Sequence, residues 1–281
     1  MAAFSVPYCS EHENEDAVAI IEVDSGHHLL MLADGVGGLP AGAQASTLAL
    51  DALIEAIQSA LFEGQPLQHG IVTGFDQANV AICERGGGGA STLAVVEIDH
   101  GQLRTYHAGD SGVLVTGQRG RLKLMTIAHS PVGYAQEAGY LTEVEAIHHE
   151  ERHVVSNLLG STDMRIEIGQ RLELSRFDTV VVGSDGLFDN LLSDEIANLI
   201  RTGDLLFAAQ ELASRARMRM ADPQPDRPSK PDDLSFILYR PRALLGRPRR
   251  PRVEPKAEPK AEPAPAPPTV EDNPSPSATG E

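Results

Sequence analysis

The sequence has few cysteines, few basic residues and no long apolar run, and each shortage excludes a class of protein. Cys9 and Cys83 are the only cysteines in 281 residues, too few for a disulfide framework or a thiolate zinc site. No uninterrupted apolar run approaches the roughly 20 residues of a membrane span. Residues 1–15 lack the basic flank and apolar block of a signal peptide. We therefore expect a soluble, cytoplasmic protein that does not bind membranes.

Basic residues are scarce relative to acidic ones. The chain has 23 Lys and Arg against 40 Asp and Glu, which gives a formal net charge of −17. This balance argues against a surface for nucleic acid or an anionic membrane, and we expect neither as a partner. A surplus of carboxylates suits metal cations, although solvated surface charge explains most acidic residues of a soluble protein.

The composition changes after Arg240. Residues 242–252 are basic and rich in proline, and the segment EPKAEPKAEPAPAPP follows. Such a segment cannot bury apolar surface and is typical of disordered or polyproline-like chain. We expect one domain over residues 1–240 and a Pro-rich disordered tail over 241–281, which is a candidate for recruiting a protein partner.

Apolar periodicity predicts short strands and pairs of helices. The expected strands are 17–23, 28–33, 91–98, 103–108, 113–116, 122–126, 171–174, 179–183 and 234–239. The expected helices are 41–61, 66–84, 194–200 with Ser193 as its cap, and 204–220. Two stacked antiparallel sheets with the helices outside would bury both sets of strands, which predicts a layered α+β sandwich.

Connecting segments add two expectations. The turns at 99–101, 109–112 and 118–120 are so short that we expect each to join adjacent antiparallel strands. Residues 129–150 are irregular and polar, which predicts an exposed insertion with a short helix near 141–147. Long irregular segments inside a compact domain are often functional lids.

Acidic residues recur where predicted strands end beside small or turn-forming residues. The sequences are LADGVGG with Asp34, AGDSG with Asp110, VGSDGLFD with Asp185, KPDDLSF with Asp232, and NED at 14–16 before a strand. Each could be a simple turn by itself. Carboxylates that converge on one edge of a sandwich repel each other, so convergence requires cations.

The ligand chemistry of such a cluster indicates a reaction. Oxygen ligands without thiolates select hard ions, Mg²⁺ or Mn²⁺. Two such ions about 3.5–4 Å apart polarise a phosphoryl oxygen and lower the pKa of a bridging water. The motifs together therefore predict metal-dependent phosphoester hydrolysis.

Other patterns have simpler interpretations. Residues 86–89 are four glycines that lack the Lys-Ser/Thr of a phosphate-binding loop, and we interpret them as a flexible connection. His148, His149 and His153 could form a transition-metal site, but their spacing fits a surface or core role equally well. Ser184 lies beside Asp185 without a local base, so we do not expect a nucleophile there.

The motifs NED, DGVGG, GDSG, SDGLFDNL and DDLS resemble, in this order, those of the metal-dependent Ser/Thr protein phosphatases, the PPM or type 2C family, in the compact bacterial form. The resemblance covers about residues 5–240. It implies a four-layer αββα sandwich, two antiparallel sheets flanked by helix pairs, with 129–150 as the flap. It also implies a signal-transduction hydrolase that removes phosphate from phosphoSer or phosphoThr in proteins, opposite a Ser/Thr kinase.

The resemblance also implies roles for individual residues. The implied catalytic residues are Asp34 and Asp185. Asp34 resembles the ligand that bridges two Mn²⁺ or Mg²⁺ ions, and a water between these ions is the implied nucleophile. Gly35 would offer its backbone carbonyl as a ligand. Asp185 and Asp232 would complete the coordination of the first ion, and Asp233 would have a supporting role. Asp16, with Glu15, would hold waters on the second ion. Asp110 resembles a ligand of a weaker third ion, which it would share with Asp185.

Two positions depart from the family pattern. The arginine that commonly binds the substrate phosphate is replaced by Glu11, and no Lys or Arg occurs before Arg85, so His12 is the nearest substitute. Val36 stands where many eukaryotic members have a histidine that can serve as general acid. The main expectation is thus a phosphatase, and the alternative is a weakly active or non-catalytic domain of the same fold that binds phosphoproteins.

Overall fold

The computed structural model describes residues 1–36, 41–146, 148–224 and 227–241. Its strands are β1 (Ala2–Val6), β2 (Asp16–Asp24), β3 (His27–Val36), β4 (Ala90–Ser91), β5 (Leu93–Asp99), β6 (Gln102–Ala108), β7 (Gly112–Thr116), β8 (Leu122–Met125), β9 (Glu167–Ile168), β10 (Leu172–Glu173), β11 (Thr179–Gly183) and β12 (Leu234–Tyr239). Its helices are α1 (Ala41–Phe62), α2 (Leu67–Arg85), α3 (Pro131–Glu137), α4 (Glu143–Ala146), α5 (Asp185–Phe188), α6 (Ser193–Ile200) and α7 (Leu205–Ala221).

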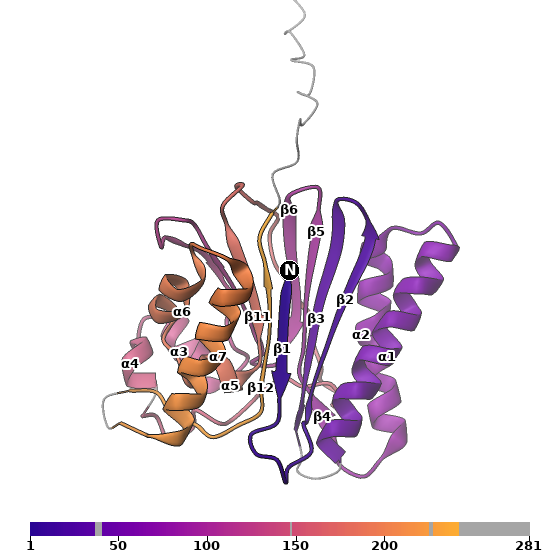
Figure 1. Ribbon diagram of the computed structural model, residues 1–281. Coiled ribbons are helices and arrows are strands. Elements are labelled where there is room, and N and C mark those ends of the chain that lie inside the picture. The colour runs from indigo at the N-terminus through magenta and orange to yellow at the C-terminus, as the bar shows by residue number, and fades with distance from the viewer. Residues whose placement is uncertain (37–40, 147, 225–226, 242–281) are drawn as a thin grey trace, which may run out of the picture. The chain divides into compact units, whose positions relative to one another are not determined.

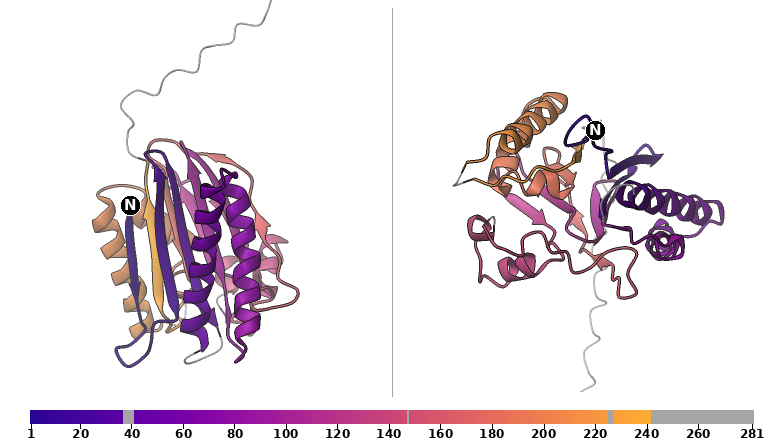
Figure 2. Two further views of the ribbon diagram at one scale, coloured as in Figure 1. Left: turned by 90° about the vertical axis from the view of Figure 1, so that its right-hand side faces the viewer. Right: turned by 90° about the horizontal axis from the view of Figure 1, so that it is seen from below.

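The strands form two antiparallel sheets that stack face to face. One sheet has the order β1-β12-β11-β7-β8, and the other has the order β10-β6-β5-β3-β2, with β4 paired to β3 and β9 to β6. The pair α1 and α2 covers the outer face of the second sheet, while α6 and α7 cover the outer face of the first (Figure 1). The view from below shows the two helical layers on opposite sides of the sheets (Figure 2). The predicted αββα sandwich is confirmed.

Successive side chains of β3 point to opposite faces of the sheet, and this explains why its sequence contains a continuous apolar run. Leu29 and Met31 point to α1 and α2, and belong to the core cluster that includes Leu53 and Phe75. Leu30 and Leu32 point the opposite way, into the cluster between the sheets. Because a strand between two layers buries both faces, both sets of positions must be apolar.

Helix α1 is long and apolar. Among the described helices, it is the one long and apolar enough to cross a membrane by length and composition, a test that core helices of soluble proteins also pass. Its residues Ala49, Leu53 and Ile57 are buried against α2 and β3. The helix is therefore accounted for as part of the core.

One predicted connection is wrong, and the difference shapes the site. The turn at 109–112 was expected to join adjacent strands of one sheet, but β6 lies in one sheet and β7 in the other. A short turn requires only that the next strand begins nearby, and in a sandwich the nearest strand can belong to the facing sheet. Gly112 pairs with Gly183 of β11, so the crossing places Asp110 where the two sheets meet.

Other local predictions need correction. Ser193 does not cap α6; the cap position is Leu192, and Ser193 instead donates from its N–H (2.7 Å) and Oγ (2.9 Å) to the Glu143 carboxylate of α4. The insertion 129–150 is more regular than expected, since α3 begins at a Ser130 cap and buries Val132. The short helix near 141–147 is α4, and residue 147 lies outside the described residues.

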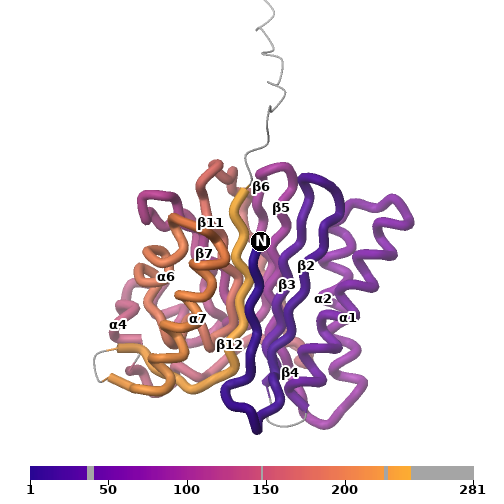
Figure 3. The backbone as a smooth tube through the Cα atoms, in the orientation of Figure 1, coloured from indigo at the N-terminus to yellow at the C-terminus, as the bar shows by residue number. Residues whose placement is uncertain are grey.

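Strand β1 was not predicted from the sequence. It pairs with β12 from Ala2 opposite Leu238 to Val6 opposite Leu234, so the two ends of the domain lie side by side (Figure 3). The predicted tail at 241–281 lies outside the described residues except for Pro241, and its boundary stays a prediction.

Candidate metal centre

The aspartates selected from the sequence come together at one end of the sandwich. Asp16 begins β2 and is the register partner of Asp34 on β3. The other three are supplied by the crossing between the sheets, by the first residue of α5 and by the segment before β12: Asp110, Asp185 and Asp232. Burial raises the pKa of Asp34 well above its usual range, and the charges of the other four aspartates raise it further. The cluster thus draws on both sheets.

Burial also raises the pKa of two carboxylates near Asp34, those of Asp16 and Asp110. It raises the pKa of Asp16 to about 8, although hydrogen bonds from Ser235 and Ser184 oppose the shift. The Ser184 Oγ donates to Asp16 at 2.9 Å, which accounts for this serine without a nucleophilic role. Burial raises the pKa of Asp110 to about 8, with the Asp185 charge as the second cause. Such shifts mark carboxylates that are crowded together in a buried place.

Hydrogen bonds tie the Asp34 backbone to the Asp110 turn. The Asp34 N–H donates to Thr92 Oγ1 at 3.1 Å, and the Thr92 N–H donates back to the Asp34 carbonyl at 2.8 Å. The Thr92 hydroxyl in turn lies 2.6 Å from Ser111 Oγ. The positions of Asp34 and Asp110 are therefore coupled through Thr92.

Glycines allow close backbone approach beside two of the aspartates. A Cβ on Gly35 would lie 2.1 Å from the Gly42 carbonyl oxygen and 2.9 Å from that of Glu15. A Cβ on Gly186 would lie 1.8 Å from the Asp233 carbonyl oxygen. These contacts hold the chain after Asp34 and after Asp185 against neighbouring backbone, where no side chain fits.

We predict that Gly186→Ala destabilises the protein by about 3 kcal/mol or more, because overlap with backbone cannot be relieved by a rotamer change. The loss would occur although alanine favours the helix in which Gly186 lies. Denaturant unfolding measures the change. Gly117→Ala is the matched control, since its Cβ would meet nothing closer than 3.5 Å. Equal unfolding free energies for the two variants would contradict the prediction.

The N-terminal segment is held by Asp233. Its Oδ1 accepts from the Tyr8 N–H at 2.8 Å, and its Oδ2 accepts from the Glu15 N–H at 2.6 Å. Glu15 Oε1 is buried without a hydrogen-bond partner among the described atoms. The exposed His12 ring bonds the Glu13 carbonyl, which raises the pKa of His12, and the nearby charge of Asp233 raises it further. His12 and Glu15 therefore both lie near the aspartate cluster.

Two residues of the cluster were missed from the sequence. The Lys230 ammonium group contacts Asp185, Asp232 and Asp189. Burial raises the pKa of Asp189 to about 7, with the charge of Asp185 as the second cause. Asp189 could have been found, because it follows Asp185 by one helical turn in SDGLFD. Lys230 carried no such signal.

The residues fit a divalent metal centre. They supply several carboxylate oxygens and no thiolate, which is the donor set of Mg²⁺ and Mn²⁺. Glu15 Oε1 is an orphaned acceptor, and buried acceptors are normally satisfied. The carboxylates at 16, 34 and 110 have raised pKa values that a cation would reverse.

A cavity of about 430 Å³ opens beside the cluster. Its wall on one side includes Asp110, Asp185 and Asp189, and on the other it includes residues of α3 and α4. Arg152 also lines this cavity, and its charge acts against the raised pKa of Asp189. The insertion 129–150 therefore forms one wall of the space next to the carboxylates.

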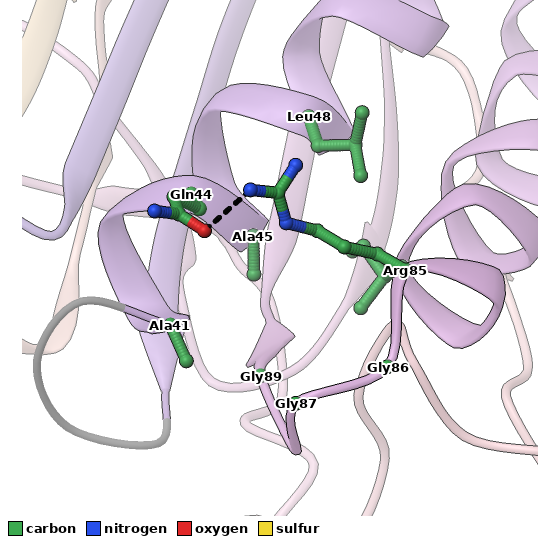
Figure 4. A pocket seen from close by; sticks show the side chains of 9 residues that line it. Ala41, Gln44, Ala45, Leu48, Arg85, Gly86, Gly87 and Gly89 are labelled. Carbon is green, nitrogen blue, oxygen red and sulfur yellow. Dashed lines mark hydrogen bonds between the residues drawn. The ribbon is translucent and has the colours of Figure 1, made fainter.

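A second cavity of about 370 Å³ lies between the N-terminal end of α1 and the C-terminal end of α2. Figure 4 shows Arg85 reaching across it, with its guanidinium group donating to Gln44 Oε1 at 2.6 Å. Residues 86–89, which were interpreted as a connection, form its rim. This cavity contains none of the clustered aspartates.

A histidine cluster also has ligand-like spacing. Among the described residues, the one group of three His, Cys, Asp or Glu side chains with ligand atoms within 4.8 Å of one another is His107, His129 and Glu167. His129 Nδ1 accepts from the Gly109 N–H (3.1 Å) and the Asn157 amide (2.8 Å), so its proton lies on Nε2, facing Glu167. We interpret this cluster as a hydrogen-bonded support for the Asp110 turn. His148 and His153, by contrast, are exposed.

Comparison with known proteins agrees with the fold. The family model Protein phosphatase 2C matches residues 9–220. The protein phosphatase PhpP of Streptococcus pneumoniae is 28% identical over 203 residues, which cover 69% of this chain and 81% of PhpP. The S. agalactiae serine/threonine phosphatase structure has a TM-score of 0.69 at 25% identity, covering 85% of this chain and 98% of that one.

A further solved structure is the catalytic domain of the phosphatase PstP in complex with two manganese ions. It has a TM-score of 0.64 at 24% identity and covers 84% of this chain and 95% of that one. The chain belongs to the protein phosphatase 2C family. It is a protein serine/threonine phosphatase, an enzyme of a metal-dependent family whose substrates are phosphoproteins.

Proposed function

We propose that the aspartate cluster is a centre for two Mn²⁺ or Mg²⁺ ions that hydrolyses phosphoSer and phosphoThr in proteins. The observation that carries this proposal is the convergence of five aspartates beside a cavity, with Asp34 among the other four. Asp34 would be a ligand of both ions, the Gly35 carbonyl would be a ligand of the second, and Asp185 and Asp232 would complete the coordination of the first. Asp16 and Glu15 would serve the second, and the PstP complex with two manganese ions supports this number.

The ions, when bound, would polarise a phosphoryl oxygen and lower the pKa of the attacking water. The chain's own residues position the substrate and the ligands. Asp233 fixes the segment that carries Glu15, and Thr92 fixes Asp34 relative to Asp110. A third ion, shared by Asp110 and Asp185, is part of the proposal, since the charge of Asp185 raises the pKa of Asp110.

Cations near the centre are candidates for holding the substrate phosphate in place of the arginine that Glu11 replaces. The hydrogen bond to the Glu13 carbonyl raises the pKa of His12, and the nearby charges of Asp233, Glu15 and Asp232 raise it further. Arg152 lines the cavity beside Asp189. We propose that His12, Arg152 or both hold the substrate phosphate.

The cellular setting is proposed from the relatives. The bacterial homologues support a cytoplasmic phosphatase. A role in signal transduction, opposite a Ser/Thr kinase, is part of the proposal. The tail at 241–281 would recruit a protein partner without contributing to catalysis.

Turnover of phosphopeptides tests the proposed function. We expect the purified chain to hydrolyse p-nitrophenyl phosphate and phosphoThr peptides with Mn²⁺ present and not after chelation. Asp185→Ala should lower kcat/KM by about a hundredfold or more, because the first ion loses a ligand. The matched control is Asp194→Ala, an exposed aspartate in the first turn of α6, which should change little. A wild-type protein that leaves both substrates intact with Mn²⁺ would overturn the proposal.

A further inference from the structure

One cation lies inside the cluster of proposed ligands. Lys230 Nζ donates to Asp185 Oδ2, lies 2.9 Å from Asp232 Oδ2 and lies 3.5 Å from Asp189 Oδ2. The lysine side chain is 24% exposed, so these carboxylates replace much of its water. A buried ammonium group of this kind is stable only while its partners remain charged and close.

The contacts of Lys230 coincide with those of the proposed first ion. Asp185 and Asp232 are the two residues that would complete that ion, and the ammonium group bonds one oxygen of each. A divalent ion binds carboxylate oxygens at roughly 2.0–2.2 Å, so it would have to enter the space around these same oxygens. Where the ion takes the oxygens that the ammonium group already bonds, the lysine and the ion compete for them, and the repulsion of like charges disfavours holding both there.

Asp189 offers the lysine a second position. It lies one helical turn after Asp185 and is not among the proposed ligands, yet its carboxylate is already 3.5 Å from Nζ. The side chain of lysine is a flexible four-carbon stem, so rotation of its own bonds can carry the charge from Asp185 and Asp232 to Asp189. No backbone movement is required.

We propose that Lys230 is the internal counter-ion of the metal centre: its ammonium group stands in the place of the first ion in the metal-free protein and moves to Asp189 when that ion binds. The inference rests on the proposed metal centre. It has two consequences. Lys230 stabilises the metal-free fold by compensating crowded carboxylates, and it lowers the affinity for the ion, which must displace it.

Calorimetric titration of the metal-free, full-length chain with MnCl₂ tests the proposal. We expect Lys230→Met to bind its tightest Mn²⁺ about tenfold more strongly than wild type, because no contact is broken on binding. The metal-free variant should also melt at a lower temperature, and Mn²⁺ should raise its melting temperature by more than it raises that of wild type. Lys230→Gln serves the same purpose if the methionine variant does not fold.

The control is Lys123→Met, which removes another lysine paired to a buried aspartate. Lys123 Nζ contacts Asp178 at 2.6 Å, at the opposite end of β11 from Asp185. This variant should lose stability without a change in Mn²⁺ affinity. Unchanged or weaker Mn²⁺ binding by Lys230→Met would overturn the proposal, while Mn²⁺ binding by wild type would leave the proposed function standing.

Asp189→Asn tests the second position of the lysine. In the wild-type background it should weaken Mn²⁺ binding, because the displaced ammonium group loses its new partner. In the Lys230→Met background the same substitution should have no effect. Equal weakening in both backgrounds would overturn the movement to Asp189, since Asp189 would then bind the ion itself. A wild-type chain that binds no Mn²⁺ would overturn the inference together with the proposed function.

Discussion

Asp34→Asn is expected to lower the Mn²⁺-dependent kcat/KM for p-nitrophenyl phosphate by about a thousandfold or more. Asp34 lies among the four other aspartates, so an ion held by any pair of them would be close to it. An amide keeps the shape of the carboxyl group but carries no charge. The variant would therefore lose the one ligand proposed to join the two ions.

The same substitution should leave the metal-free fold intact. Burial and neighbouring charges raise the pKa of Asp34 well above its usual range, because they disfavour its charged form, and the amide carries no such charge. Thermal unfolding in EDTA should give a melting temperature no lower than that of wild type. Asp99→Asn, at an exposed hairpin on β5, controls for the loss of a charge. An Asp34→Asn enzyme with about a tenth of wild-type activity would contradict a bridging role.

The second large effect is on the pH dependence of stability. The pKa of both Asp16 and Asp110 is raised to about 8 in the metal-free protein, from an ordinary value of 3.8. Between these values the folded state holds protons that the unfolded state has released. The metal-free protein should therefore lose stability steadily as pH rises from about 4 to about 8.

Mn²⁺ should reverse this trend, because it replaces the protons. We expect the rise in melting temperature caused by Mn²⁺ to be small near pH 5.5 and to grow steadily toward about pH 8. Scanning calorimetry at matched ionic strength, with Mn²⁺ or with EDTA, measures it. Asp110→Asn should flatten the slope of the metal-free series. A Mn²⁺ effect that is constant or shrinks with pH would refute the assignment of these raised pKa values to the metal centre.

The sequence predicted those parts of the fold whose signals are local. The strands at 179–183 and 234–239 agree with β11 and β12 to the residue, because each is a mostly apolar segment bounded by turn residues. Strand β1 was missed, since Ala2–Val6 is recognisable as a strand only beside β12. The crossing at 109–112 was misassigned for a related reason, because turn length does not say which sheet receives the next strand.

The residues of the site also divide into those with a local signal in the sequence and those without one. Asp34 and Asp185 could be found because glycine and an apolar strand surround each of them, which is a pattern visible along the chain. Lys230 could not, because its importance lies in contacts with Asp185 and Asp189, more than forty positions away. The roles of the aspartates as ligands stay a prediction until an ion is observed on them.

The crossing at 109–112 has a consequence for how the site forms. Asp16 and Asp34 are carried by one sheet, whereas Asp185 and Asp232 flank strands of the other, and each sheet has its own core cluster beneath its own helices. Neither half contains a complete set of carboxylates, and bringing the halves together concentrates negative charge at one end of their junction. We therefore expect the affinity for the ion to depend on how closely the two sheets pack against each other. Substitutions in the hydrophobic cluster between the sheets, such as Val182→Ala, should weaken Mn²⁺ binding although they change no ligand.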